Sequence, residues 1–182
     1  MESPLKLAMQ ALAMMGVGIL ASLLVWKLTH DPPPPKVGAP APGFSLPRLD
    51  GSGSISLRSL RGKVVVLNFF QSACNGCKQE SPMLERLWRQ DRRRGVVVLG
   101  VDAFELSRGD GTRFVRAYGL TYPIVFDGIG LVAGNSYAVF NLPVTYVLNR
   151  KGRIVGGELL GALNNATYEQ TLRRYIDAAV RS

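Results

Sequence analysis

Two apolar runs of strand length limit the fold of this chain more than any other feature. The first, KVVVLNFF, occupies residues 63–70, and the second, GVVVLGVD, occupies residues 95–102. Continuous runs of this kind are typical of strands buried on both faces of a parallel sheet. The interval between them is long enough for a crossover helix, which we place at about residues 74–93. The chain is therefore predicted to fold around a central α/β sheet.

The rest of the chain continues this alternation of strands and helices. We predict a helix over residues 110–118, with Asp110 as its N-cap and Gly119 just beyond its last turn. The other expected elements are a strand at 121–127, a short helix at 131–137, two strands joined by a tight turn at 149–152, and a closing helix at 166–180. Asn164 and Asn165 are expected to introduce the closing helix. The predicted sheet is mostly parallel, ends in an antiparallel hairpin and has helices on both faces.

An apolar run at residues 7–26 sets the N-terminal part of the chain apart. It contains no charged residue and, as a helix, spans roughly 30 Å, the thickness of the hydrocarbon core of a bilayer. We predict one membrane-spanning anchor within residues 1–30, with membrane lipid as its partner; a cleaved signal peptide and a buried core helix are the alternatives. Residues 31–43 hold six of the eleven prolines and are predicted to be a stiff linker, followed by a folded domain at 44–182.

The net charge of +9 is compatible with nucleic-acid binding, so the distribution of the basic residues matters. The densest cluster falls at the C-terminal end of the helix predicted at 74–93. Cations at that end complement the helix dipole, which makes a solvated helix end the better interpretation. Attraction to anionic lipid is the second interpretation. We predict no nucleic-acid partner; the cluster consists of Arg86, Arg89, Arg92, Arg93 and Arg94.

The only two cysteines, Cys74 and Cys77, lie in the segment QSACNGCKQE, directly after the first apolar run. A structural disulfide across so short a loop would restrict the unfolded chain little. Structural zinc normally needs four ligands, and the only histidine, His30, lies outside the predicted domain. Covalent haem attachment needs a histidine after the second cysteine, where this chain has Lys78. We therefore predict a redox-active dithiol, with no metal or other cofactor.

The position of the pair at a helix start indicates different roles for the two thiols. If Cys74 caps the helix, unpaired backbone N–H groups and the helix dipole favour its thiolate, the form that attacks disulfides. Cys77, one turn further along, would be shielded from solvent. Cys74 is thus the candidate nucleophile and Cys77 the candidate resolving thiol.

These features resemble the thioredoxin fold. The resemblance rests on the cysteine pair after VVVLNFF, on Pro82, on NLPVTYVL at residues 141–148 and on Gly161 after the predicted hairpin, and it covers about residues 37–180. It implies a three-layer sandwich in which a cis-proline lies opposite the cysteines, and Pro143 matches that proline. The backbone beside it is expected to align the substrate as an added strand. The expected substrate-binding residues are Ala73, Asn75, Gly76, Leu142 and Pro143.

The interval between Cys77 and Pro143 is longer than plain thioredoxin needs, which implies a central insert. With the apolar run, the proline-rich linker and the lead-in APGFSLPRLDG, the chain resembles the TlpA, ResA and CcmG group of membrane-tethered thiol-disulfide oxidoreductases. The resemblance implies a single-pass protein of the bacterial cytoplasmic membrane, with its catalytic domain on the outer side. It also implies net reduction of protein disulfides, including those of apocytochromes c during cytochrome c maturation, and a membrane protein that donates the dithiol electrons.

Glu80 matches the C-x-x-C-x-x-E pattern of this group. On a helix it lies one turn from Cys77, so we expect it to assist proton movement; a solvated helix glutamate is the alternative. Thioredoxin places a buried aspartate where this chain has Asn68, which cannot titrate. Two further departures, Ala73 in place of a tryptophan and Gly76 in place of a frequent proline, affect partner choice and the thiolate pKa.

The sequence leaves two other functions open. The lead-in FSLPRLDG is compatible with a peroxiredoxin-like thiol peroxidase, although that group has a threonine where this chain has Gln71. The second is a tethered binding or chaperone module in which the two cysteines only pack.

Overall fold

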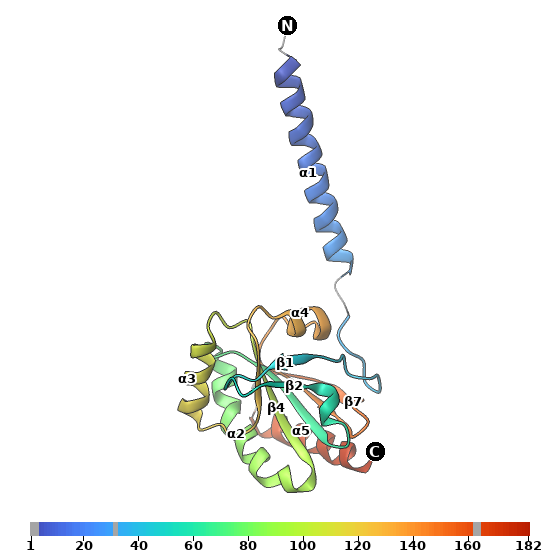
Figure 1. Cartoon of the computed structure of the whole chain (residues 1–182). Coiled ribbons are helices and arrows are strands. Elements are labelled where there is room, and N and C mark those ends of the chain that lie inside the picture. Colours follow the sequence, from blue (N-terminus) through green and yellow to red (C-terminus); the bar gives the residue numbers. More distant parts are fainter. Residues whose placement is uncertain (1–3, 31–32, 162–164) are drawn as a thin grey trace. The chain divides into compact units, whose positions relative to one another are not determined.

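The computed structural model describes residues 4–30, 33–161 and 165–182 (Figure 1). The chain divides into two compact units, Met1–Pro32 and Pro33–Ser182. The elements of the second unit, in order, are β1 (Ser45–Pro47), β2 (Ser54–Ser56), η1 (Leu57–Leu60), β3 (Val64–Phe70), α2 (Asn75–Asp91), η2 (Arg92–Arg94), β4 (Val96–Ala103), α3 (Arg108–Tyr118), β5 (Ile124–Asp127), α4 (Leu131–Tyr137), β6 (Val144–Leu148), β7 (Ile154–Leu160) and α5 (Asn165–Arg181).

The first unit contains helix α1 (Pro4–His30), which includes the helix expected at residues 7–26. Many of its large apolar side chains are exposed, among them Leu20 and Trp26. In the parts of the chain that the structure describes, no helix combines the length and the apolar character that crossing a membrane requires. The predicted helix is therefore present, whereas its predicted membrane span is not confirmed.

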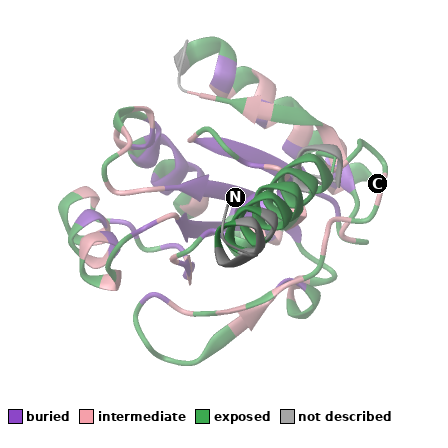
Figure 2. Cartoon of the chain, turned by 90° about the horizontal axis from the view of Figure 1, so that it is seen from above, coloured by how far each residue is buried: buried purple, intermediate pink, exposed green. Residues whose placement is uncertain are grey.

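The second unit is built on a five-stranded sheet of order β5-β4-β3-β6-β7. Strands β3, β4 and β5 are parallel, while β6 and β7 form an antiparallel hairpin beside β3. Figure 2 shows the central strands in the colour of buried residues, and every residue of β3 and β4 is buried. The two continuous apolar runs thus form the centre of the sheet, as predicted.

Side chains of β3 alternate between two cores, one on each face of the sheet. Val64 and Val66 pack with apolar residues of α2, α3 and α5 on one face. Val65 and Leu67 pack with residues of η1 and α4 on the other face. This alternation is the ordinary consequence of the two-residue period of a strand, and it gives the layered α/β fold that the sequence predicts.

Two details differ from the sequence prediction. Helix α3 begins at Arg108 with Ser107 as its N-cap, because the Ser107 Oγ accepts a hydrogen bond from the backbone N–H of Gly109 at 3.0 Å. The prediction of Asp110 as N-cap is wrong; Asp110 lies in the first turn, where its charge complements the dipole and pairs with Arg113. The closing helix is present as α5, and Asn164, expected to introduce it, lies outside the described residues.

The segment before β1 is packed on the domain. The Gly38 N–H donates to the Ile154 carbonyl at 2.9 Å, and the Ala41 N–H donates to the Gly152 carbonyl at 3.0 Å. A short hairpin of β1 and β2 follows, which the sequence analysis did not anticipate. The end of the predicted linker therefore pairs with the turn before β7 and with the start of that strand.

Candidate active site

Cys74 and Cys77 are joined by a disulfide at the end of the sheet where β3 passes into α2. Cys74 is the N-cap of α2, and its Sγ accepts a hydrogen bond from the backbone N–H of Cys77 at 3.1 Å. Cys74 is partly exposed, whereas Cys77 is fully buried. The structure thus brings together one accessible sulfur at a helix N-terminus and one shielded sulfur behind it.

Three of the expected substrate-binding residues adjoin the disulfide in sequence. Ala73 and Asn75 are exposed, and Gly76 is partly buried in the first turn of α2. A tryptophan at this position would cover the region in front of Cys74. The small side chain of Ala73 leaves more of that region uncovered. A partner protein would therefore meet the backbone and small side chains here.

Pro143 lies at the same end of the sheet as the disulfide. The Leu142–Pro143 peptide bond is cis, and the next residue, Val144, pairs with Phe69 near the end of β3. The Pro143 carbonyl accepts a hydrogen bond from the Gly161 N–H at 3.0 Å. Within the described residues, the backbone of Leu142 makes no hydrogen bond to another backbone group. Leu142 thus has backbone groups without a backbone partner at the end of the sheet that carries the disulfide.

Glu80 is buried one helical turn beyond Cys77, with only 2% of its surface exposed. Asn68 on β3 donates a hydrogen bond from its Nδ2 to the Glu80 Oε1 at 2.6 Å and a second to the Thr145 Oγ1 on β6 at 3.0 Å. The Tyr168 hydroxyl on α5 donates to the same Thr145 oxygen at 2.9 Å. The alternative that Glu80 is an ordinary solvated glutamate is therefore excluded by its burial.

Burial gives this carboxyl group an unusual affinity for a proton. Desolvation raises the pKa of Glu80 to about 7, against the smaller lowering effect of the hydrogen bond from Asn68. The other oxygen, Oε2, is buried without a hydrogen-bond partner among the described residues. Glu80 is consequently a group that changes charge near neutral pH beside a buried thiol position.

Thr145 and Tyr168 were not predicted as site residues. Thr145 belongs to a strand that reads as an apolar run, and Tyr168 belongs to the amphipathic closing helix. No local signal distinguishes them from core residues. Their polar groups meet Asn68 only because β6 pairs with β3 and α5 packs on the same face of the sheet.

The loop that leads into Cys74 is held by the loop after β4. The Ser72 backbone N–H and Oγ both donate to the carboxylate of Glu105, at 2.8 and 3.0 Å. The Gln71 side chain donates to the carbonyl of Phe104, whose φ of 57° places it in the left-handed region. These contacts fix the backbone just before the first cysteine, and no sequence motif predicted them.

A second buried carboxyl group, Asp102, lies at the same end of β4. It is fully buried, and neither of its oxygens has a hydrogen-bond partner among the described residues. Burial raises its pKa to about 8, with additional contributions from the neighbouring carboxylates of Glu105 and Asp110. A Cβ at Gly111 would collide with its Oδ2, so the absence of a side chain there makes room for Asp102.

Among the residues that the structure describes, no group of three or more His, Cys, Asp or Glu side chains is placed to hold a metal ion. The chemistry that the site can perform on its own is exchange between the two cysteines and an external disulfide or dithiol.

A thioredoxin-like α/β fold with a redox disulfide at the start of a helix defines a thiol-disulfide oxidoreductase. A family model described as the AhpC/TSA family matches residues 37–156, and the chain belongs to that family. It is thus a thiol-disulfide oxidoreductase of the ResA and DsbE type.

Named relatives agree with this assignment. The thiol-disulfide oxidoreductase ResA of Halalkalibacterium halodurans is 40% identical over 120 residues, which cover 66% of this chain and 66% of that protein. The thioredoxin-like protein YneN of Bacillus subtilis is 35% identical over 164 residues, covering 85% and 94%. A crystal structure described as a thiol:disulfide interchange protein DsbE from Chlorobium tepidum has a TM-score of 0.73 at 26% identity, covering 80% of this chain and 99% of the other.

Proposed function

We propose that this protein reduces disulfides of other proteins through its Cys74–Cys77 dithiol. The observation that carries the proposal is the asymmetry of the two sulfurs, one partly exposed at a helix N-terminus and hydrogen-bonded to a backbone N–H, the other buried. In the reduced protein, these surroundings favour a thiolate at Cys74.

The reaction proceeds by two exchanges. The Cys74 thiolate attacks one sulfur of the substrate disulfide, a mixed disulfide forms, and the other substrate sulfur leaves as a thiolate. Cys77 then loses its proton and attacks the Cys74 sulfur. The Cys74–Cys77 bond forms, the second substrate thiolate leaves, and two electrons have passed to the substrate. An external dithiol must reduce the protein again before the next cycle.

Glu80 is the group that we assign to the proton of Cys77. Its raised pKa allows the carboxylate to accept a proton near neutral pH, and its unpartnered Oε2 has no competing donor among the described residues. We place the substrate segment along Leu142, whose free backbone groups and neighbouring cis-Pro143 suit an added strand.

We also propose where the protein acts and which proteins it exchanges electrons with. The exposed apolar surface of α1 supports attachment to a lipid membrane, with the catalytic domain on the outer side of a bacterial cytoplasmic membrane. A membrane protein would then supply the reducing dithiol. By the sequence resemblance described above, the paired cysteines of apocytochrome c are the first substrate to test. Extraction of the full chain from membranes with alkaline carbonate tests the attachment; release of all the protein would contradict it.

Trapping of the mixed disulfide tests the central step. In Cys77→Ser, the resolving thiol is absent, so Cys74 should accumulate disulfide-linked adducts with its substrates that reductant releases. In Cys74→Ser, the buried Cys77 should form few adducts, which makes this variant the matched control. Equal adduct levels in the two variants would refute the assigned roles, and mass spectrometry of the adducts identifies the partners.

Two further measurements separate reduction from its alternatives. A redox titration should give a midpoint well below the strongly oxidising value of about −120 mV; a midpoint near that value would make net oxidation the function. A steady-state assay with hydrogen peroxide should show little turnover. Rapid turnover would favour a thiol peroxidase, for which Gln71 lacks the hydroxyl of the usual threonine.

A further inference from the structure

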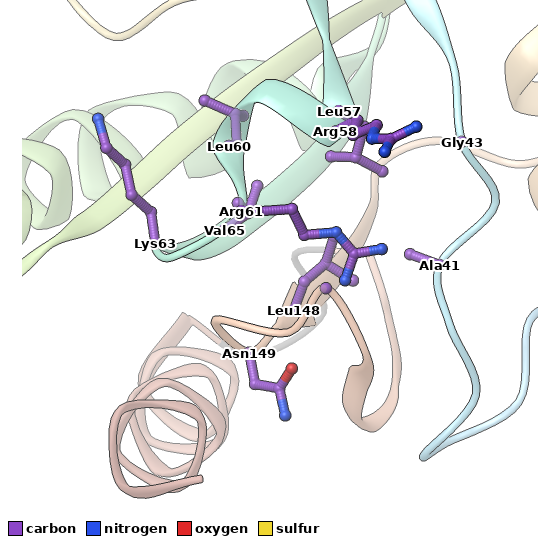
Figure 3. A pocket seen from close by; sticks show the side chains of 11 residues that line it. Ala41, Gly43, Leu57, Arg58, Leu60, Arg61, Lys63, Val65, Leu148 and Asn149 are labelled. Atoms are coloured by element: carbon purple, nitrogen blue, oxygen red, sulfur yellow. The ribbon is translucent and has the colours of Figure 1, made fainter.

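A pocket of about 540 Å³ lies at the end of the sheet opposite the disulfide. Its walls come from η1, from the beginning of β3, from the end of β6 and from the segment that carries Ala41 and Gly43 (Figure 3). Strand β3 leads from this pocket toward the cysteines, and its six steps from Val64 to Phe70 correspond to roughly 20 Å. The pocket is therefore separate from the site of disulfide exchange.

All charged residues of the pocket lining are basic. The lining contains Arg58, Arg61 and Lys63 and no acidic residue. Among the described residues, no carboxylate forms an ion pair with any of these three side chains. Two more cations, Arg150 and Lys151, lie on the adjacent turn, where the Arg150 carbonyl accepts a hydrogen bond from the Gly62 N–H at 2.9 Å. An anion bound here would meet positive side chains and no acidic side chain of the lining.

The two arginines converge on the same side of the pocket. In Figure 3, Arg58 and Arg61 extend toward the segment with Ala41 and Gly43. The Arg61 guanidinium occupies the space that a Cβ at Gly152 would need, and Gly152 has a φ of 68°. The exposed Arg61 side chain thus lies over the glycine of the neighbouring turn.

Apart from Asn149, the other side chains of the lining are apolar. Leu57 and Leu148 are buried and Leu60 is half-buried, and together with Val65 they give the pocket a hydrophobic side next to the guanidinium groups. Inorganic phosphate has no apolar group, so it would leave these leucine side chains without a contact. A molecule that joins a phosphate to an apolar group matches both parts of the lining.

We propose that this pocket binds the headgroup of an anionic phospholipid, with the phosphate at Arg58 and Arg61 and the adjoining apolar carbons against the leucines. The charge of the lining and its mixed character select this occupant. The segment that forms one wall, with Ala41 and Gly43, lies at the end of the proline-rich stretch that follows helix α1 in the chain. The binding function does not depend on the dithiol, because the pocket and the disulfide are at opposite ends of β3.

The test uses the full chain in a non-ionic detergent at about 150 mM salt, where weak surface attraction is screened. Three probes are titrated: dihexanoylphosphatidylglycerol, dihexanoylphosphatidylcholine and inorganic phosphate. Calorimetry gives the affinity, and amide exchange of residues 57–63 reports whether the probe binds in the pocket. The phosphatidylglycerol should bind about tenfold or more tightly than either other probe and should protect these residues.

Two matched double variants separate the pocket from general charge. Arg58→Ser with Arg61→Ser should weaken phosphatidylglycerol binding about tenfold or more. Arg116→Ser with Arg174→Ser removes the same charge from exposed positions outside the pocket and should leave binding unchanged. Both variants should keep wild-type disulfide reduction, which shows that they are folded and that failure of one function leaves the other intact.

A third variant adds a charge instead of removing one. A Cβ at Gly43 has no atom within 4 Å, so Gly43→Glu fits the fold and places a carboxylate in the pocket wall. It should abolish the protection by phosphatidylglycerol. Equal binding of the two lipids, phosphate binding as tightly as the phosphatidylglycerol, or equal losses in both double variants would each overturn the proposal.

Discussion

The Asn68 amide donates a 2.6 Å hydrogen bond to the Glu80 carboxyl group inside the domain, across the junction of β3 and α2. Asn68 cannot take up or release a proton, so Glu80 is the titrating member of this pair. The same amide also reaches Thr145, which ties the carboxyl group to the hairpin strand that follows Pro143. Glu80 therefore belongs to a hydrogen-bond network that joins α2, β3 and β6.

Replacing Glu80 by Gln should slow the resolution of the mixed disulfide about tenfold to a hundredfold, because the base that accepts the Cys77 proton is lost. In the wild type, the rate should rise as the pH increases through about 7, where Glu80 becomes a carboxylate. This rise should be absent in Glu80→Gln. Stopped-flow single turnovers with a disulfide peptide, measured from pH 5.5 to 8.5, give both profiles.

The control for this prediction is Glu169→Gln, which changes a partly exposed helix glutamate on α5. Its profile should match that of the wild type. If Glu80→Gln kept the same rate and the same inflection, Glu80 would have no part in proton movement, and its burial would be only structural.

The stability of the domain should fall as the pH rises. Glu80 and Asp102 have pKa values of about 7 and 8 in the fold, above their ordinary values of 4.5 and 3.8. The protonated forms are favoured by folding, so their contribution is complete below pH 4 and is lost as the pH rises through 7 and 8. Each unit of raised pKa corresponds to about 1.4 kcal/mol of unfolding free energy.

Asp102→Asn removes one of these two contributions. Its unfolding free energy, measured by urea denaturation from pH 4 to 9, should decline less than that of the wild type, with the difference concentrated between pH 4 and 8. Parallel curves for the two proteins would show that Asp102 titrates normally.

Gly111→Ala should destabilise the domain by about 2–4 kcal/mol, because the new methyl group would collide with the buried Asp102 Oδ2. Gly134→Ala is the matched control, since its Cβ meets only a Phe140 atom at 3.8 Å. This helical substitution should be neutral or slightly stabilising. Thermal unfolding should give a lower melting temperature for Gly111→Ala than for Gly134→Ala. Similar melting temperatures would show that the new methyl group does not collide with Asp102.

Glu105→Ala should loosen the loop before Cys74. The Ser72 N–H loses a charged acceptor, whose hydrogen bond is worth about 1.5–3 kcal/mol, so its amide should exchange about tenfold or more rapidly. Ser72→Ala removes only the Oγ contact and should have a smaller effect. Hydrogen exchange of the peptide with residues 71–74 measures both, and unchanged exchange in Glu105→Ala would show that the loop is held by other contacts.

Local patterns were sufficient for most elements of the fold. The short helix predicted at residues 131–137 is α4 with the same bounds, and the turn at 149–152 joins β6 to β7 as expected. The prediction at Asp110 was wrong because Ser107 and Asp110 are both good N-cap residues, and only the path of the chain after β4 decides between them. The β1–β2 hairpin was missed because its strands are only three residues long.

The sequence by itself determined the order of strands and helices and the place of the cysteines at a helix start, because hydrophobic periodicity and capping act over a few neighbouring residues. The resemblance to a C-x-x-C-x-x-E pattern also pointed to Glu80. Only the tertiary structure decided that Glu80 is buried against Asn68 and that Glu105 holds Ser72. These contacts join residues 12 and 33 positions apart, and that between Asn68 and Thr145 joins residues 77 positions apart. Sheet pairing and helix packing bring such residues together, and no short stretch of sequence carries that information.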